Sequence, residues 1–271
     1  DGRQCIVTSS IGIATIDGGS GEPIDPVALL RNADSAMYRA KRDGRAHWHH
    51  FDDALVHEVT RRFELESDLG PALARGEFVL HFQPIHELAQ HTIVGVEAFL
   101  GWEHPKRGFL RSDEFVELAE QTGTIVPIGA WAMKAACTQA RHWQDAGWPG
   151  WMSVNLSGRE LAEPGFAATV ADLLGETGLA PDRLWLELTE SVFLRANRTS
   201  TDELKRLQLL GVHIGLDEFG AGETPLPKLQ QLPTDFLQND GGLIANLTAD
   251  GEMHPPGCDM VAALVKVGTT L

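Results

Sequence analysis

Cysteine is scarce in this sequence, and the few cysteines form no recognisable pattern. Cys5, Cys137 and Cys258 lie far apart in a chain of 271 residues. An odd number of cysteines at unrelated spacings fits neither a disulfide framework nor a zinc site. We therefore expect a reducing, cytoplasmic setting.

Basic residues and long apolar runs are also lacking. The chain has 22 Lys and Arg against 38 Asp and Glu, a formal net charge of −16. This balance excludes a nucleic-acid-binding protein held by bulk charge, because neutralising phosphates needs a basic face. No apolar run reaches the ~18 residues that span a bilayer, so we expect membrane association only through an upstream domain. The 43% of hydrophobic residues is enough for a sizeable globular core.

The beginning of the chain predicts a small α+β segment over residues 1–50. A β-rich run at 4–16 precedes a helix that Asp25 can cap and whose first turn Pro26 can occupy. Residues 51–76 predict a charged, exposed linker helix, and residues 77–271 a second domain. One strand and one helix are too little for a domain, so we expect the chain to begin partway through a fold.

Beyond residue 77, short apolar runs alternate with helical patterns, which is typical of a parallel α/β architecture. The predicted strands are Phe78–Ile85, Thr92–Trp102, Trp151–Leu156, Leu184–Thr189, Val212–Phe219 and Asp235–Asp240. A capping box of Ser200 and Glu203 predicts the start of one helix, and Gly211 its end.

Four predicted strands carry a polar residue near the carboxyl end of the face that is not aliphatic. These residues are Glu97, Asn155, Glu187 and Asp217. The carboxyl ends of parallel strands open on one side of a sheet or barrel, so we expect the four side chains to converge. Three carboxylates and an amide suit Mg²⁺, Mn²⁺ or Ca²⁺, since such charges repel one another without a cation. Each alone is most simply a polar strand end; four in phase argue against coincidence.

Six motifs then occur in an order and spacing typical of one bacterial family. They are Gln83-Pro84-Ile85, Val96-Glu97-Ala98-Phe99, Phe115-Val116-Glu117-Leu118-Ala119-Glu120, Val154-Asn155-Leu156-Ser157, Glu187-Leu188-Thr189-Glu190 and Asp217-Glu218-Phe219-Gly220. Over about residues 72–271 the sequence resembles the EAL domain. The resemblance implies a TIM-like (β/α) barrel of the α/β class, incomplete in this chain, and the hydrolysis of cyclic di-GMP.

The leading segment resembles the C-terminal part of a GGDEF, or diguanylate cyclase-like, domain. The likeness lies in Ser10-Ile11-Gly12 and Ala36-Met37-Tyr38. The signature Gly-Gly-Asp-Glu-Phe loop is not in the chain, so we expect no cyclase activity from this segment.

The EAL resemblance implies a metal site and a ligand site. Glu97, Asn155, Glu187 and Asp217 match the family's metal ligands, and Glu218 stands where a second aspartate usually helps to hold a second ion. We expect Mg²⁺ or Mn²⁺, two of which would activate a water and neutralise the developing charge. Gln83 and Asp240 match ligand-binding positions.

Three departures from the family pattern argue against turnover. Gly101 replaces an arginine that pairs with a ligand phosphate, and Gln238 replaces a lysine at the catalytic water. The family's general-base glutamate, in an Ala-Glu-Gly-Val-Glu segment, is not in residues 1–271. By the family count two strands are missing as well, so we expect a fragment of a longer protein and assign no catalytic residue.

Three functional hypotheses follow. The first is a cyclic di-GMP signalling module with a degenerate EAL domain, which binds the nucleotide weakly or not at all and acts through a protein partner or as a homodimer. The second is an active metal-dependent phosphodiesterase in the full-length protein. The third is a protein-interaction scaffold. The retained acidic residues argue against the scaffold, and the lost lysine and arginine argue against the active enzyme.

Overall fold

The computed structural model describes residues 9–15, 25–42, 47–51, 53–219, 233–239, 248–249 and 252–253. It divides into two compact units, residues 1–70 and residues 71–271. Among the described helices, none is both long enough and apolar enough to cross a membrane.

The first unit contains a two-stranded parallel sheet, β1 (Ile11–Ile13) and β2 (Trp48–His50), against which helix α1 (Pro26–Arg42) packs. The predicted start of α1 is confirmed, because Asp25 Oδ1 accepts a hydrogen bond from the Val27 backbone N–H at 2.9 Å. A side chain at Gly12 would collide with the α1 backbone, since its Cβ would lie 1.9 Å from the Ala33 carbonyl oxygen. Helix α2 (Asp53–Ala72) follows within the region predicted as a linker helix.

The second unit is built on a seven-stranded sheet in the order β3-β4-β6-β7-β8-β9, with β5 paired to β4. The strands are β3 (Phe78–Glu87), β4 (Thr92–His104), β5 (Gly108–Arg111), β6 (Trp151–Asn155), β7 (Leu184–Thr189), β8 (His213–Phe219) and β9 (Phe236–Asn239). All six predicted strands of this region are therefore confirmed. Two short strands, β10 (Thr248–Ala249) and β11 (Glu252–Met253), pair with each other.

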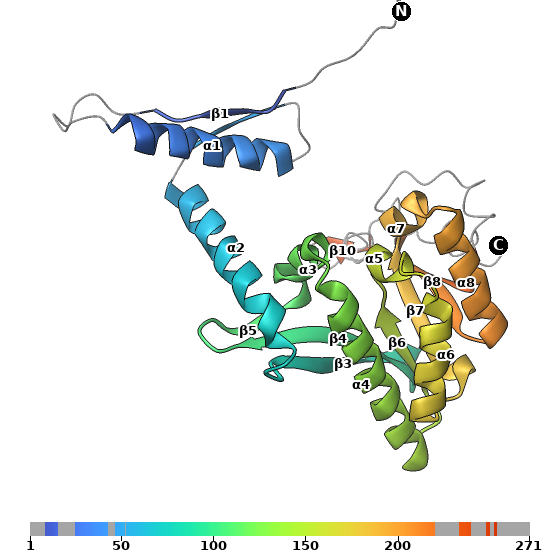
Figure 1. Ribbon diagram of the computed structural model, residues 1–271. Coiled ribbons are helices and arrows are strands. Elements are labelled where there is room, and N and C mark those ends of the chain that lie inside the picture. The colour runs from blue at the N-terminus through green and yellow to red at the C-terminus, as the bar shows by residue number, and fades with distance from the viewer. Residues whose placement is uncertain are drawn as a thin grey trace, which may run out of the picture. The chain divides into compact units, whose positions relative to one another are not determined.

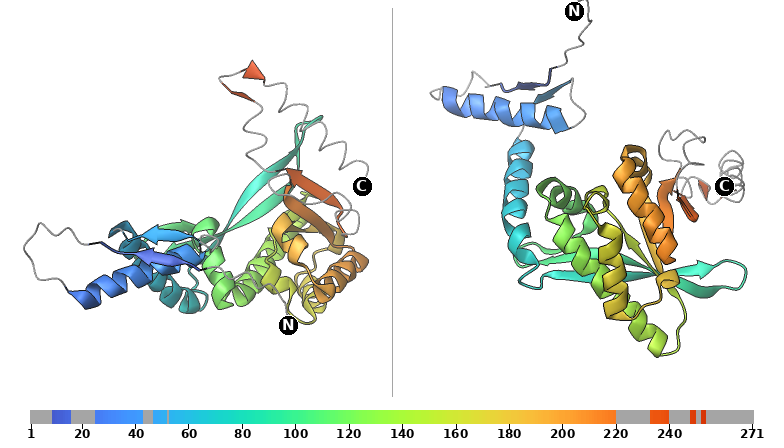
Figure 2. Two further views of the ribbon diagram at one scale, coloured as in Figure 1. Left: turned by 90° about the horizontal axis from the view of Figure 1, so that it is seen from above. Right: turned by 45° about the vertical axis from the view of Figure 1, so that its right-hand side comes forward.

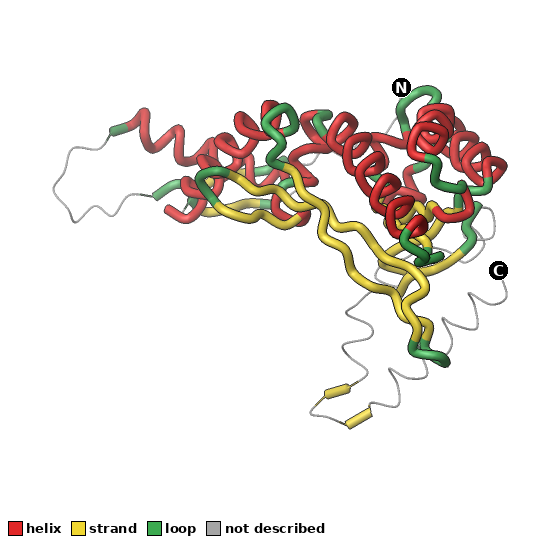
Figure 3. Tube along the Cα trace, turned by 90° about the horizontal axis from the view of Figure 1, so that it is seen from below, coloured by secondary structure: helices red, strands yellow, loops and turns green. Residues whose placement is uncertain are grey.

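The sheet is parallel, as the sequence predicts, except at one edge. Strands β4, β6, β7, β8 and β9 are parallel, whereas β3 and β5 pair antiparallel with β4. Only residues 88–91 join β3 to β4, and so short a connection permits a hairpin but no parallel crossover. Figure 3 shows β3 and β4 side by side as a long, curved pair.

Helices cover one face of the parallel strands (Figures 1 and 2). The longer ones are α4 (Ile125–Asp145), α6 (Phe166–Thr177) and α8 (Arg198–Leu210); the shorter ones are α3 (Val116–Thr122), α5 (Gly158–Leu161), α7 (Glu190–Arg195) and the 3₁₀ turns Ser112–Glu114 and Pro181–Arg183. The aliphatic strand residues pack beneath them: Met152, Leu186 and Ile214 are fully buried in one core. Strand–helix alternation around such a core is the TIM-like barrel arrangement that the sequence predicts.

The predicted capping box of α8 is wrong. The helix is capped by Asn197, whose side chain accepts a hydrogen bond from the Ser200 backbone N–H at 2.9 Å. Glu203 is buried and reaches across to α6, where it accepts a hydrogen bond from the Ala167 N–H at 2.8 Å. On its own helix it also accepts one from Arg206 at 2.6 Å. A carboxylate at the first turn of α6 satisfies a backbone donor that the helix leaves unpaired.

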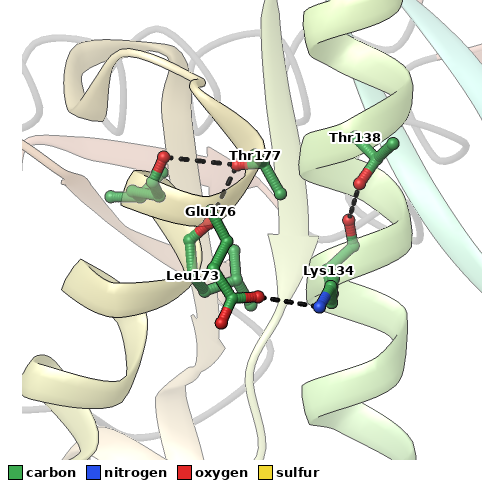
Figure 4. A network of polar contacts seen from close by, with 6 residues as sticks. Lys134, Thr138, Leu173, Glu176 and Thr177 are labelled. Atoms are coloured by element: carbon green, nitrogen blue, oxygen red, sulfur yellow. Dashed lines mark hydrogen bonds and ion pairs between the residues drawn. The ribbon is translucent and has the colours of Figure 1, made fainter.

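A second contact between helices is a solvent-exposed ion pair that joins α4 to α6. Lys134 on α4 donates to Glu176 on α6 at 2.7 Å, and the hydroxyls of Thr138 and Thr177 bond to carbonyls of their own helices (Figure 4). The Lys134 and Glu176 side chains are 59% and 61% exposed. Water and salt screen exposed ion pairs, so this pair contributes little to stability.

These two carboxylates give a matched comparison. We expect Glu203→Ala to lower the free energy of unfolding by about 2–3 kcal/mol. The variant loses the carboxylate that accepts both hydrogen bonds, so the Ala167 N–H is left buried without its acceptor. Glu176→Ala removes the same side chain from the surface and should leave the melting temperature nearly unchanged. Thermal denaturation of the two variants in parallel measures the difference, and equal losses would show that the Glu203 contact does not stabilise α6.

Candidate ligand and metal site

A cavity of about 920 Å³ lies at the carboxyl ends of the parallel strands. Its lining includes every described residue that the sequence analysis assigned to the site. These residues are Gln83, Glu97, Asn155, Glu187, Asp217, Glu218 and Gln238. Asp240 lies outside the described residues, so its assignment stays a prediction.

The strand register brings these side chains together. Glu97 on β4 lies opposite Gln83 on β3 and Ser153 on β6, and Asn155 at the end of β6 lies opposite Glu187 on β7. The expectation that Glu97 lies near a strand end is wrong, because β4 continues to His104 and pairs there with β3 and β5. The hairpin extends β4 beyond the cavity and leaves Glu97 in the middle of the strand.

Neutral side chains hold two of the carboxylates. The Asn155 amide donates to Glu97 Oε1 at 2.8 Å. The Gln238 side chain also hydrogen-bonds to Glu97. The Ser153 hydroxyl donates to Glu187 Oε1. Ser153 is a site residue that was not predicted, although its place between aliphatic Met152 and Val154 puts it on the same strand face as Asn155.

The electrostatics of the cavity favour a bound cation. Burial raises the pKa of both Glu97 and Glu187, and the negative charge of Asp217 raises both further. Glu187 Oε2 is buried without a hydrogen-bond partner among the described residues. A cation would offset this repulsion and desolvation. As the described side chains stand, however, no three Asp, Glu, His or Cys residues are grouped closely enough to hold an ion.

The backbone at the end of β8 is strained. Glu218 has φ of 56°, in the left-handed region, and its N–H donates to Asp217 Oδ1 at 2.7 Å. This conformation costs a residue with a side chain about 1–2 kcal/mol. Such strain is common where a structure must hold a functional group in place, and here it fixes the Asp217 carboxylate beside the other two.

At Gly101, where the family resemblance implies an arginine, a side chain would have to displace the Phe109 ring. An added Cβ would lie 2.3 Å from Cε2 of Phe109, which sits on the neighbouring strand β5. The Phe109 ring is 49% exposed and packs edge-on against His81, with ring centroids 4.8 Å apart. The loss of a cationic side chain at residue 101 is therefore coupled to a phenyl ring that occupies its space.

Glu160 is a buried acid in the cavity wall that the sequence analysis did not assign. Its Oε2 accepts hydrogen bonds from the Ser157 N–H and hydroxyl at 3.1 and 2.6 Å, which completes a capping box at the start of α5. A Cβ at Gly129 would lie only 1.8 Å from its Oε1. Burial raises the pKa of Glu160 to about 7, so the fold prefers this group protonated.

The shift predicts a pH-dependent effect of Glu160→Gln. A raised carboxyl pKa means that stability is complete below the usual value of 4.5 and is lost as the pH rises towards 7. Glutamine resembles the protonated acid at every pH, so the variant should melt higher than the wild type at pH 8 and equally at pH 5. The gain at pH 8 should be about 1–3 kcal/mol. Glu176→Gln is the exposed control, and a gain that is the same at both pH values would contradict a buried titrating group.

A barrel domain with an acidic cavity at its strand ends is the class that this fold and site define. The EAL domain family matches residues 66–267. An uncharacterized signaling protein of Caulobacter vibrioides is 34% identical over 273 residues, which cover 100% of this chain and 32% of that protein. The bifunctional diguanylate cyclase/cyclic di-GMP phosphodiesterase MucR of Pseudomonas aeruginosa is 38% identical over 266 residues, 98% of this chain and 38% of that protein.

Among solved structures, the PaMucR phosphodiesterase in its c-di-GMP complex is 39% identical. It superposes with a TM-score of 0.70 over 76% of this chain and 83% of that one. The chain belongs to the EAL domain family. It spans about a third of the length of the two relatives from Caulobacter and Pseudomonas.

Proposed function

We propose that the chain is part of a cyclic di-GMP signalling protein and that its EAL domain binds the nucleotide weakly, without efficient turnover. The single observation that carries this proposal is the convergence of Glu97, Asn155, Glu187 and Asp217 on one cavity. A relative with a structure in a c-di-GMP complex supports the choice of ligand. Calorimetric titration of the 271-residue chain with cyclic di-GMP in Mg²⁺ tests it, and the absence of heat at millimolar nucleotide would contradict it.

Two departures from the family pattern, Gln238 in the cavity lining and Gly101 on β4, support binding over turnover. Gln238 hydrogen-bonds to Glu97 with a neutral amide, where the family resemblance implies a lysine. Gly101 carries no side chain, and Phe109 occupies the space. A neutral amide supplies no positive charge to a transition state that gains negative charge. The alternative, an active phosphodiesterase in the full-length protein, is favoured by relatives such as the cyclic di-GMP phosphodiesterase NbdA of Pseudomonas aeruginosa, 33% identical.

We also propose that residues 1–50 are the C-terminal part of a GGDEF-like domain and that 51–76 is a linker to the EAL domain at 77–271. The match to the bifunctional cyclase and phosphodiesterase MucR supports this, because it covers 98% of the chain and so extends well before the EAL match at residue 66.

A divalent cation, Mg²⁺ or Mn²⁺, fits the chemistry of the cavity. Glu97, Asn155, Glu187 and Asp217 would hold it, with Glu218 beside them. The unpartnered Oε2 of Glu187 and the raised pKa values of Glu97 and Glu187 support this assignment. When bound, such an ion supplies positive charge for a phosphodiester and lowers the pKa of a bound water.

We therefore expect millimolar Mg²⁺ or Mn²⁺ to raise the melting temperature of the chain, since a ligand that binds only the folded state stabilises it. Glu187→Ala should abolish the increase, because the carboxylate with the unpartnered oxygen is removed. Glu176→Ala, with the same change in charge far from the cavity wall, should keep it. Differential scanning calorimetry with and without EDTA decides this, and an equal metal response of both variants would show that the ion binds elsewhere.

We expect no measurable hydrolysis of cyclic di-GMP by the chain and no rescue by Gln238→Lys alone. The substitution restores one positive charge, an effect worth about 100- to 1000-fold in comparable sites. General base catalysis also needs an acceptor within hydrogen-bond reach, and the segment that supplies it in the family is not in residues 1–271. Chromatographic detection of linear dinucleotide measures both proteins; product from the Gln238→Lys variant would show that another residue acts as the base.

A further inference from the structure

The residues that line the cavity carry negative charge that no basic residue of the described lining offsets. Eight of the described residues that line it are Asp or Glu, and none is Lys or Arg. The proposed ligand carries two negatively charged phosphodiesters, so an all-acidic lining repels it. A divalent cation offsets part of this charge, and a cationic side chain at the rim would offset more.

Arg111 lies at that rim. It is the last residue of β5, and the next two residues, Ser112 and Asp113, both line the cavity. The Arg111 Nε lies 3.5 Å from Oδ1 of Asp113, which places the base of the guanidinium beside a lining carboxylate. Its backbone is fixed by the β4–β5 pairing and by a hydrogen bond from its N–H to Glu114 Oε1 at 3.2 Å.

Arg111 is also the direct cross-strand partner of Gly101. Opposite residues of an antiparallel pair direct their side chains to the same sheet face, with Cβ atoms about 5 Å apart. Phe109, two residues before Arg111 on β5, projects to that face as well and fills the space above Gly101. Strand β5 therefore carries both the phenyl ring that fills the space above Gly101 and, directly opposite Gly101, the guanidinium of Arg111.

The guanidinium is available to a ligand. The Arg111 side chain is 76% exposed and that of Asp113 is 69% exposed. An ion pair at 3.5 Å in water is weak and exchanges readily. Arginine matches phosphate with parallel N–H groups, which a point charge does not.

From this geometry we propose that Arg111 is a ligand-binding residue, which contacts a phosphodiester of the nucleotide and takes over the charge that Gly101 lacks. The proposal rests on the proposed function of the cavity. It implies that nucleotide binding depends on β5, a strand that the sequence analysis did not predict.

Isothermal titration of cyclic di-GMP into the 271-residue chain, with Mg²⁺ present, tests the assignment. Arg111→Gln should weaken binding by about 10-fold or more, the scale of a charge-assisted hydrogen bond. The affinity of Arg111→Lys should lie between those of the wild type and Arg111→Gln, because lysine keeps the positive charge but lacks the planar guanidinium. Arg107→Gln is the matched control: it makes the same charge change in the exposed β4–β5 turn and should stay within about twofold.

A variant designed to restore nucleotide affinity provides a second test. Phe109→Ala combined with Gly101→Arg in the Arg111→Gln background should regain most of the affinity, because the ring that blocks residue 101 is removed. Melting curves of all variants show that each is folded. Equal weakening by Arg111→Gln and Arg107→Gln, or no weakening by Arg111→Gln, would overturn the role of Arg111. Absence of binding by the wild type would instead overturn the proposed function.

Discussion

The repulsion among three carboxylates is the constraint on which the rest of this domain depends. Glu97, Glu187 and Asp217 come from three different strands and meet in one cavity, where burial and mutual repulsion raise the pKa of the first two. No single strand holds such a group in place. The parallel register fixes their positions, and the apolar core beneath the helices provides the free energy that keeps the register.

Neutral hydrogen-bond donors make this arrangement tolerable. Asn155, Ser153 and Gln238 each hydrogen-bond to a carboxylate without adding charge. They fix the orientation of Glu97 and Glu187 but neutralise neither, so the cavity keeps its affinity for a cation. Gln238 fits this pattern: on β9 it acts as one more neutral hydrogen-bond partner of Glu97, whereas a lysine there would compete with a metal for the same carboxylate.

The antiparallel β3–β4–β5 edge gives the barrel its asymmetric rim. It extends β4 past the cavity, places Gly101 and Phe109 in contact, and ends at Arg111 beside the acidic lining. Strands β4, β7 and β8 supply Glu97, Glu187 and Asp217, and β5 supplies Phe109 and Arg111. Changes in specificity within such a domain can therefore arise at the hairpin while the carboxylates stay in place.

The sequence alone determined the positions of six strands, though not of β5, because period-2 alternation and local motifs depend only on neighbouring residues. It also placed Glu97, Asn155, Glu187 and Asp217 on one side of the sheet. Only the tertiary structure decided what those residues contact. The reach of Glu203 to α6, the support of Glu187 by Ser153 and the contact of Phe109 with Gly101 all join residues from different elements. Such contacts follow from chain crossing and strand register, which no local pattern encodes.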